Sequence, residues 1–500
     1  MSLREKLPAS SLQQCKKALP FVDGDFMESP SGPKIQMYSS VDGCETLDYR
    51  AADSAEVDAA VAAAASAFDK VWAELSPSSR KRHLTAFADA ILEFESEFAE
   101  LDSVDMGKPI SVARGEVAIA AGFIRYYAEA IDKIVMGEVP LTGTGATEIQ
   151  HWRPRGVVAA IIPWNFPLIN ACLKLGPALA AGNTCILKPS DISPRSALLL
   201  AAVAKLAGIP DGVVSVLPGD GNTARQLVAD PTVSMLTFTG STATGKQILA
   251  EMGRSTIKPV LLECGGKSAE IVFESTRELG IEAVASRIVA GAFWNQGQVC
   301  VARSRTLIQA SCFDELSAAI VAEAAKIKPG LPSSEDVQFG PLASRQQFER
   351  VLGYIDRGVK EGGKLLLDGR SPADCETGLF VGPTVIAGLE SDSPVVREEI
   401  FGPVIVLLPF DDEEHALSLA NDSEYGLAAT LWTTSQSQCH RMAARVRAGK
   451  VRVMSSLAMV EPAGFNHSAE PCGQSGFGVE GGLEGMRSYL RKQSVEHIYG

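Results

Sequence analysis

The sequence lacks long apolar runs and has few aromatic residues, and these shortages exclude several classes of protein. Aromatic residues make up only 6% of the 500 residues. No stretch of about eighteen consecutive apolar residues occurs, so no membrane-spanning helix is predicted. The N-terminal segment MSLREKLPASSLQQC contains no continuous apolar core of the kind found in secretory signals. We therefore expect a cytoplasmic protein without a membrane partner.

Paired cysteines and clustered histidines are also missing. None of the 10 cysteines forms a CxxC pair, and the 6 histidines show no ligand spacing with the cysteines or with each other. No metal site is therefore predicted. Scattered, unpaired thiols are typical of a protein kept in a reducing cytoplasm.

Basic residues are too few for a protein that binds polyanions. The chain has 46 Lys and Arg against 60 Asp and Glu, a formal net charge of −14. A chain this acidic, without a basic stripe, is a poor ligand for nucleic acid and for anionic membranes, so small molecules are the expected partners. Its length predicts at least two large domains, and a hydrophobic content of 46% indicates an ordered, enzyme-like chain.

Two alternating series of strands and helices are predicted after an N-terminal helical region. Residues 53–131 have helical spacing, whereas 132–155 mixes Gly, Pro and Thr with short β-prone pieces and is interpreted as an extended ribbon. Short β-branched runs then begin near residues 157, 185, 213, 234 and 259, with helical stretches between most of them. This alternation is typical of βαβ units and predicts a parallel sheet covered on both faces.

The second series begins after about residue 263. Its predicted strands are EIVF, RTLIQ, KLLLD, TVIAG, VIVLLPF, LAATLW and KVRVM, separated by helices near 280–293, 313–327, 346–361, 412–421 and 435–447. The expected fold class is therefore α/β, with two parallel-sheet domains and a cleft between them.

One cysteine stands in an unusual context. Cys300 ends the segment FWNQGQVC, after an apolar helix and a Gly-Gln turn. From the residues alone it is either a reactive thiol or a buried packing residue, and packing is the more common role of a free cysteine.

Further motifs accompany this segment along most of the chain. They are PWNFP (163–167), KPSD (188–191), FTGSTATGK (238–246), LECGGKS (262–268) and EEIFGP (398–403). In this order the set resembles the aldehyde dehydrogenase superfamily, of the NAD(P)-dependent, hydrolytic type. The resemblance implies two Rossmann-like domains and a small β-ribbon oligomerisation element. We expect a dinucleotide-binding domain at 1–131 and 154–262, a catalytic domain at 263–465, and oligomerisation segments at 132–153 and 480–500.

Three catalytic residues are implied by this resemblance. An aldehyde has no leaving group, so its carbonyl must gain a nucleophile before it can donate hydride; Cys300 would attack and form a thiohemiacetal. Asn165 would stabilise the resulting oxyanion with the backbone N–H of Cys300. After hydride transfer leaves a thioester, Glu263 would activate the water that hydrolyses it. Lys174 matches a family lysine near the proton path, but an exposed helix lysine is an equal alternative.

The cofactor residues come from the same resemblance. Gly240 and Gly245 follow a predicted strand and open a helix, where glycine and a helix N-terminus favour a close phosphate. A carboxylate at Asp191 would repel a 2′-phosphate, which favours NAD while leaving NADP open. The implied cofactor-binding residues are Ile162, Trp164, Lys188, Asp191, Gly221, Phe238, Gly240, Ser241, Gly245, Glu399 and Phe401.

The sequence specifies the substrate and the acyl acceptor less closely than the catalytic residues. The expected partner is a small-molecule aldehyde of unspecified class, and the ribbon and C-terminal tail predict a homodimer or homotetramer. An acylating enzyme that passes its acyl group to coenzyme A is one alternative, and a catalytically silent relative is another. Glu263 favours water as the acceptor. Cys264, beside Glu263, is interpreted as packing, with an oxidative cross-link to Cys300 as the alternative.

Overall fold

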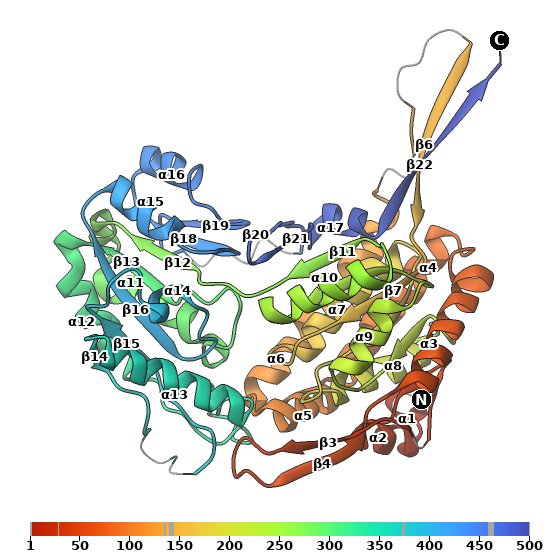
Figure 1. The fold of residues 1–500 in the computed structure, drawn as a ribbon, viewed down its shortest axis with the longest axis horizontal. Helices are drawn as coiled ribbons and strands as arrows, with labels where there is room; N and C mark the ends of the chain where they lie inside the picture. Colours follow the sequence, from red (N-terminus) through yellow and green to blue (C-terminus); the bar gives the residue numbers. More distant parts are fainter. Residues whose placement is uncertain are drawn as a thin grey trace.

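A computed structural model describes residues 3–28, 30–134, 137–139, 145–372, 375, 377–458 and 465–499. Figure 1 shows two lobes, each built around a sheet, and a narrow arm that projects from one of them. The α/β fold class predicted from the alternating segments is confirmed. The division of the chain into the expected domain boundaries stays a prediction.

The first lobe contains an eight-stranded sheet in the order β2-β1-β9-β8-β7-β10-β11-β21. Its five central strands are parallel and coincide with the predicted runs: β7 (Val157–Ile161), β8 (Thr184–Lys188), β9 (Val214–Val216), β10 (Val233–Thr239) and β11 (Val260–Glu263). Their side chains are mostly buried on both faces, which explains the continuous apolar runs. The edges are antiparallel, unlike the predicted all-parallel sheet, because β1 (Phe21–Val22), β2 (Asp25–Phe26) and β21 (Gly476–Phe477) come from the two ends of the chain.

Helices cover both faces of this sheet. The connecting helices are α7 (Pro167–Ala180), α8 (Arg195–Leu206), α9 (Gly221–Ala229) and α10 (Thr242–Ser255). The N-terminal helical region forms α3 (Ser54–Ala67), the π-turn η1 (Phe68–Trp72), α4 (Pro77–Glu93), α5 (Glu95–Met106) and α6 (Ile110–Ala130). It is preceded by α1 (Leu3–Lys6), α2 (Ala9–Lys16) and the hairpin of β3 (Lys34–Tyr38) with β4 (Glu45–Arg50), which sequence patterns did not predict. The main core of the lobe lies between α4–α8 and the sheet.

The second lobe has a seven-stranded sheet in the order β14-β15-β16-β13-β12-β18-β19. All seven predicted strands form: β12 (Ala269–Val272), β13 (Arg305–Gln309), β14 (Lys364–Leu367), β15 (Thr384–Ala387), β16 (Val404–Phe410), β18 (Ala428–Trp432) and β19 (Lys450–Met454). Only β14 at one edge is antiparallel. The helical elements are η2 (Glu274–Leu279), α11 (Ile281–Phe293), η3 (Trp294–Gly297), η4 (Ala310–Cys312), α12 (Phe313–Ala324), α13 (Arg345–Lys360), α14 (Pro394–Arg397), α15 (Glu413–Asn421) and α16 (Gln436–Ala443).

The arm is a three-stranded sheet in the order β22-β6-β5 (Figure 1). The long strand β6 (Ala146–Pro154) pairs antiparallel with β22 (Leu490–Ile498) along its whole length, and β5 (Gly137–Glu138) pairs with part of β6. The predicted ribbon is therefore extended at 137–138 and 146–154, whereas residues 132–134 form a turn after α6. Residues 135–136 and 140–144 lie outside the described part. Within the described residues, no helix has the length and apolarity needed to cross a membrane.

The C-terminal segment returns to the first sheet before it enters the arm. Strand β20 (Cys472–Gly473) pairs with β17 (Tyr425–Gly426), β21 pairs antiparallel with β11, and α17 (Gly482–Ser488) precedes β22. In the β21–β11 pair, Gly476 lies opposite Glu263, and the backbone N–H of Cys264 donates to the Ser475 carbonyl at 2.9 Å. The end of the chain therefore supports the strand that carries Glu263.

Candidate active site

A cavity of about 500 Å³ is lined by residues from both lobes. It brings together seven of the residues predicted from sequence, namely Trp164, Asn165, Gly240, Ser241, Cys300, Glu399 and Phe401. Its other lining residues are Pro163, Thr239, Thr242, Ala243, Cys264, Gly265, Ser344, Gln346, Gln347, Arg350 and Tyr425. A mixed polar and apolar cavity of this size is typical of a site for a small molecule or cofactor.

A rare backbone conformation precedes Cys300. Asn295, Gln296 and Gly297 have φ values of 49°, 57° and 67°, three consecutive residues in the left-handed region. Such a conformation costs on the order of 1–3 kcal/mol for each non-glycine residue and persists only where the surroundings impose it. A Cβ on Gly297 would lie 2.3 Å from the Gly402 carbonyl oxygen, so glycine is required there. The close packing of this turn fixes the position of Cys300.

Asn165 is joined to the same turn by hydrogen bonds in both directions. Its side-chain Nδ2 donates to the Gln298 carbonyl at 2.9 Å, and its own carbonyl accepts from Asn295 Nδ2 at 3.1 Å. The residue is buried. An amide nitrogen carries two hydrogens, so one donor of Asn165 is left for a ligand next to Cys300.

The Cys300 thiol is strongly disfavoured as a thiolate in this site. Burial raises its pKa to about 12, and the negative charges of Glu399 and Glu263 add to the rise. The thiol is therefore protonated at neutral pH and needs a nearby base when it attacks.

Glu263, at the end of β11, has the properties of such a base. Burial raises its pKa to about 9; Glu480 adds to the rise, while Lys174 opposes it. Lys174 is fully buried in α7 and forms an ion pair with Glu480. The alternative that Lys174 is an exposed helix residue is therefore wrong, and the Lys174–Glu480 ion pair acts on the charge of Glu263.

The segment after Glu263 holds a second carboxylate in place. The backbone N–H of Gly266 donates to Glu399 Oε1 at 2.9 Å, and a Cβ on Gly265 would lie 2.4 Å from Glu399 Oε2. Burial raises the pKa of Glu399 to about 7, against the lowering effect of Gly266, Arg350 and Lys267. Gly265 therefore leaves room for the Glu399 carboxylate beside the proposed base, and the Gly266 N–H holds it there.

Aromatic rings enclose part of the cavity near Glu399. The Trp164 and Phe401 rings meet edge to face with their centroids 5.3 Å apart. Phe401 has a φ of 60°, which is rare outside glycine, and its carbonyl accepts a hydrogen bond from Gln347 Nε2 at 2.7 Å. Strained backbone on both sides of the cavity indicates a preorganised site.

The turn from β10 to α10 has the features expected of a pyrophosphate site. Ser241 is the N-cap of α10, so the helix N-terminus faces the cavity that Gly240 and Ser241 line. A Cβ on Gly245 would lie 2.8 Å from Cys264 Sγ, and one on Gly240 would lie 2.5 Å from the ring of Phe238. Phe238 is buried, so it supports the turn from below. The Thr239 hydroxyl, which lines the cavity, has no hydrogen-bond partner among the described residues. A buried hydroxyl without a partner is expected where a polar ligand supplies one.

The remaining predicted cofactor residues lie at the same end of the sheet but outside the cavity lining. Ile162 directly follows β7, and Lys188 is the last residue of the neighbouring strand β8. The Ile162 N–H donates to the Lys188 carbonyl at 3.1 Å. Burial lowers the pKa of Lys188, and the negative charges of Asp191 and Asp220 oppose this lowering. The Asp191 carboxylate accepts from Ser190 Oγ at 3.1 Å. A Cβ on Gly221, at the start of α9, would meet no atom within 4 Å, so packing does not require glycine there.

Sequence reasoning missed several residues of the cavity wall. Gln347 and Arg350 lie on α13, and Arg350 Nη2 donates to the Glu399 carbonyl at 2.5 Å. Tyr425 comes from the short strand β17. Gln347 and Arg350 belong to no motif, and a polar residue on one face of an amphipathic helix is usually a solvated one. Tyr425 lies in NDSEYGLAA (421–429), a segment that also resembles the family, but no role was predicted for it. No group of three or more His, Cys, Asp or Glu that could hold a metal occurs in the described residues.

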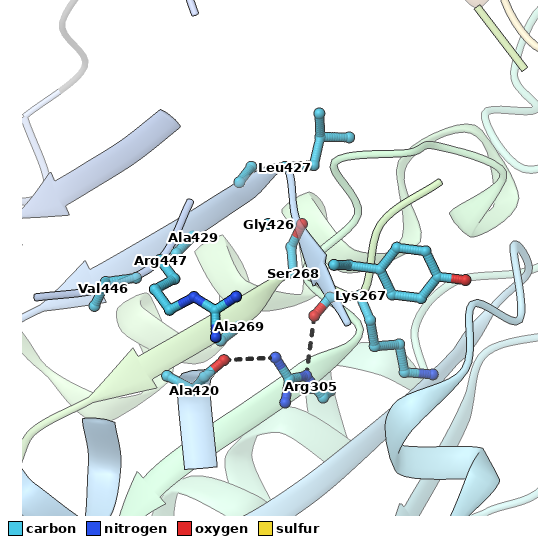
Figure 2. A pocket seen from close by; sticks show the side chains of 12 residues that line it. Lys267, Ser268, Ala269, Arg305, Ala420, Gly426, Leu427, Ala429, Val446 and Arg447 are labelled. Carbon is cyan, nitrogen blue, oxygen red and sulfur yellow. Dashed lines mark hydrogen bonds between the residues drawn. The ribbon is translucent and has the colours of Figure 1, made fainter. Parts of the chain in front are cut away.

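A much smaller pocket lies behind the LECGGKS segment (Figure 2). Arg305 donates from Nε to the Lys267 carbonyl and from Nη2 to the Ala420 carbonyl, both at 2.9 Å, and from Nη1 to the Leu419 carbonyl at 3.0 Å. The last two carbonyls belong to the C-terminal turn of α15, where a cation is favourable. Arg305 therefore connects the end of the LECGGKS segment to α15 of the second lobe by hydrogen bonds.

Comparison with known proteins identifies the family. The aldehyde dehydrogenase family matches residues 26–495. The chain is 42% identical over 436 residues to the NADP/NAD-dependent aldehyde dehydrogenase PuuC of Escherichia coli (strain K12), covering 87% of each protein. Its structure matches that of the aldehyde dehydrogenase KauB from Pseudomonas aeruginosa with a TM-score of 0.92, at 39% identity and 96% coverage of both chains. It also matches P. syringae AldA, an indole-3-acetaldehyde dehydrogenase solved with NAD+ and IAA, with a TM-score of 0.92, at 36% identity and with 98% and 99% of the two chains covered. This chain belongs to the aldehyde dehydrogenase family.

Proposed function

We propose that this protein oxidises an aldehyde to the carboxylic acid with NAD, through a thioester on Cys300 that Glu263 helps to hydrolyse. The enzyme is an oxidoreductase of the aldehyde dehydrogenase class. The observation that carries the proposal is one cavity lined by Cys300, Asn165 and Glu399 together with the Gly240–Ser241 turn. Nucleophile, oxyanion donor and dinucleotide-binding elements thus share one space.

The first step is attack of the Cys300 sulfur on the aldehyde carbon. Because its pKa is about 12, the thiol must lose its proton as the S–C bond forms, and the raised pKa of Glu263 makes this carboxylate a suited acceptor. The carbonyl oxygen gains negative charge, which the free Nδ2 hydrogen of Asn165 and the Cys300 N–H would stabilise. Each such donor typically lowers the barrier by ~3–4 kcal/mol.

Hydride loss then gives the thioester. NAD, when bound, supplies the nicotinamide ring that accepts this hydride. Glu399 would hold the nicotinamide ribose, and Phe401 would pack beside it. Helix α10 would bind the pyrophosphate with its N-terminus. Asp191 favours NAD over NADP, because its carboxylate repels a 2′-phosphate; its short side chain leaves some use of NADP open.

Hydrolysis returns the enzyme to its starting state. Glu263 first releases to solvent the proton that it took from the Cys300 thiol. It then takes a proton from water, whose oxygen attacks the thioester carbon; the C–S bond breaks to release the acid, and the Cys300 thiolate takes this proton from Glu263 and becomes the thiol again. The buried Lys174–Glu480 pair lies beside Glu263 and supports this proton transfer, because it holds charge close to a carboxyl that must gain and lose a proton.

Two further expectations follow the same proposal. The exposed edges of the β5–β6–β22 arm favour pairing with another copy, as a homodimer or homotetramer. A reducing cytoplasm would keep the Cys300 thiol available for catalysis.

The test of the function is an NADH absorbance assay with a panel of aliphatic, aromatic, amino- and hydroxy-substituted aldehydes and semialdehydes. We expect turnover without coenzyme A and a preference for NAD over NADP. Turnover that requires coenzyme A would favour the acylating alternative, and no turnover with any member would favour the silent one.

The rate of thioester hydrolysis should rise with pH up to about 9. Glu263 acts as a base only when ionised, and its pKa is raised to about 9, so its basic form increases as the pH approaches that value. Below it, the rate should change roughly tenfold for each pH unit. The measurement is the deacylation rate after a stopped-flow burst between pH 6 and 10. A rate already constant at pH 6 would contradict the role of this carboxyl.

A further inference from the structure

The turn formed by residues 107–109 (GKP) joins α5 to α6 and lies behind the loop that carries Asn165. Gly107 has a φ of 73°, and a Cβ there would lie 2.3 Å from Ser40 Oγ and 2.7 Å from the ring of Pro341. The Gly107 carbonyl is packed against Gly340, where a Cβ would approach it to 2.4 Å. The turn is therefore clamped on two sides, which fixes the backbone from which Lys108 extends.

Lys108 reaches from this turn to the loop that carries Asn165. Its side chain has no exposed surface; Nζ lies 2.6 Å from Glu116 Oε2 and donates to the Asn165 carbonyl at 2.9 Å. The same ammonium lies 4.2 Å from the ring centroid of Phe166, the residue after Asn165. One buried cation thus contacts two consecutive residues of the PWNFP loop.

A buried ion pair is an inefficient way to stabilise a fold. Removing two charges from water costs about as much as their attraction returns, and well-packed apolar residues of similar volume often serve equally well. A methionine and a leucine would fill the same space between α6 and the loop. Such side chains could not donate to the Asn165 carbonyl, and this hydrogen bond is the specific contribution of Lys108.

The Asn165 peptide is held by two donors at one atom. Its carbonyl accepts from Lys108 Nζ and from Asn295 Nδ2, while its side-chain amide donates to Gln298. The lysine fixes the peptide from the α6 side, and the Cys300 turn fixes it from the other. A small rotation of this peptide would move the side-chain N–H that faces the developing oxyanion. Oxyanion donors act only within a narrow range of geometry.

We propose that Lys108, oriented by Glu116, is a positioning residue for the Asn165 oxyanion donor. The inference rests on the proposed function, in which Asn165 stabilises the thiohemiacetal oxygen. The buried Lys108–Glu116 ion pair, which does not line the cavity, would then affect the rate of hydride transfer.

The experiment is a double-mutant cycle with Lys108→Met and Asn165→Ala, read as the single-turnover rate of NADH formation. Lys108→Met should lower this rate roughly 10- to 100-fold, a part of the loss expected for removing the donor itself. In the Asn165→Ala background, the same change should cost less than about 3-fold, because residues that act through one another are not additive. The affinity for NAD, measured by fluorescence titration, should stay within about 2-fold of the wild type.

Two further variants separate positioning from folding. Arg195→Met removes another buried ion pair, between α8 and Asp105 of α5, and should reduce the unfolding temperature while leaving the NADH rate unchanged. Glu116→Gln keeps the shape of the pair and should show the same non-additive loss as Lys108→Met, which keeps the test available if the methionine variant does not fold.

Each contrary result has a distinct meaning. Equal losses in both backgrounds would show that Lys108 and Glu116 act independently of Asn165 and would overturn the inference alone. An Asn165→Ala enzyme with the wild-type rate would overturn the oxyanion role itself, and the positioning role with it.

Discussion

Replacement of Cys300 by alanine should reduce NAD-dependent aldehyde oxidation to background, a loss on the order of 10⁴-fold or more. Without the sulfur no thiohemiacetal forms, and the aldehyde carbon never becomes a good hydride donor. The Asn165 donor and the Gly240–Ser241 turn remain in the variant, so cofactor binding should persist. The loss should therefore appear in kcat rather than in the affinity for NAD.

The measurement is steady-state NADH formation beside a fluorescence titration with NAD. Cys264→Ala is the matched control, because Cys264 lines the same cavity and is also a free cysteine. This variant should retain activity close to that of the wild type. Full steady-state turnover by the Cys300→Ala enzyme would show that Cys300 is not the nucleophile.

Glu263→Gln should separate the two halves of the reaction. A glutamine cannot accept a proton from water, so acid release should slow by roughly 10²- to 10⁴-fold, the usual contribution of a general base. A first turnover of NADH should still appear as a burst, followed by a slow steady state. The thioester should accumulate on Cys300.

Mass spectrometry of the quenched enzyme detects that thioester as an added acyl mass on the peptide containing Cys300. Glu251→Gln on α10 is the control for loss of a carboxylate on the same lobe, and it should show no accumulation. Addition of coenzyme A tests whether a thiol acceptor restores turnover. A Glu263→Gln enzyme with a normal steady state and no burst would refute the base.

The regular part of the fold was predictable because its signals are local. Strands such as β10 are buried on both faces and therefore appear as short β-branched runs, and the turn into α10 carries its own serine cap and glycines. The N-terminal hairpin of β3 and β4 was not predicted, because its strands are short and largely exposed and their apolar residues alternate over only a few positions. The antiparallel edges β1 and β21 are only two residues long, too short for any periodicity.

The site was predictable where a motif carries the chemistry and not where distant residues meet. Cys300, Asn165 and Glu399 stand in segments whose residues identify them. Lys174 and Glu480, by contrast, lie 306 positions apart, and their ion pair depends on α7 meeting the C-terminal segment. A lysine in a predicted helix is ordinarily exposed, so no local signal marks this one as buried.

The pairing of β21 with β11 has a consequence for the order of events during synthesis. The strand that ends at Glu263 finds its edge partner only when residues 475–477 have emerged from the ribosome, more than two hundred positions later. A nascent chain therefore contains Cys300, the proposed nucleophile, long before the strand that carries Glu263, the proposed base, has its edge partner. The segment that holds this carboxylate in place is therefore among the last parts of the chain to be synthesised.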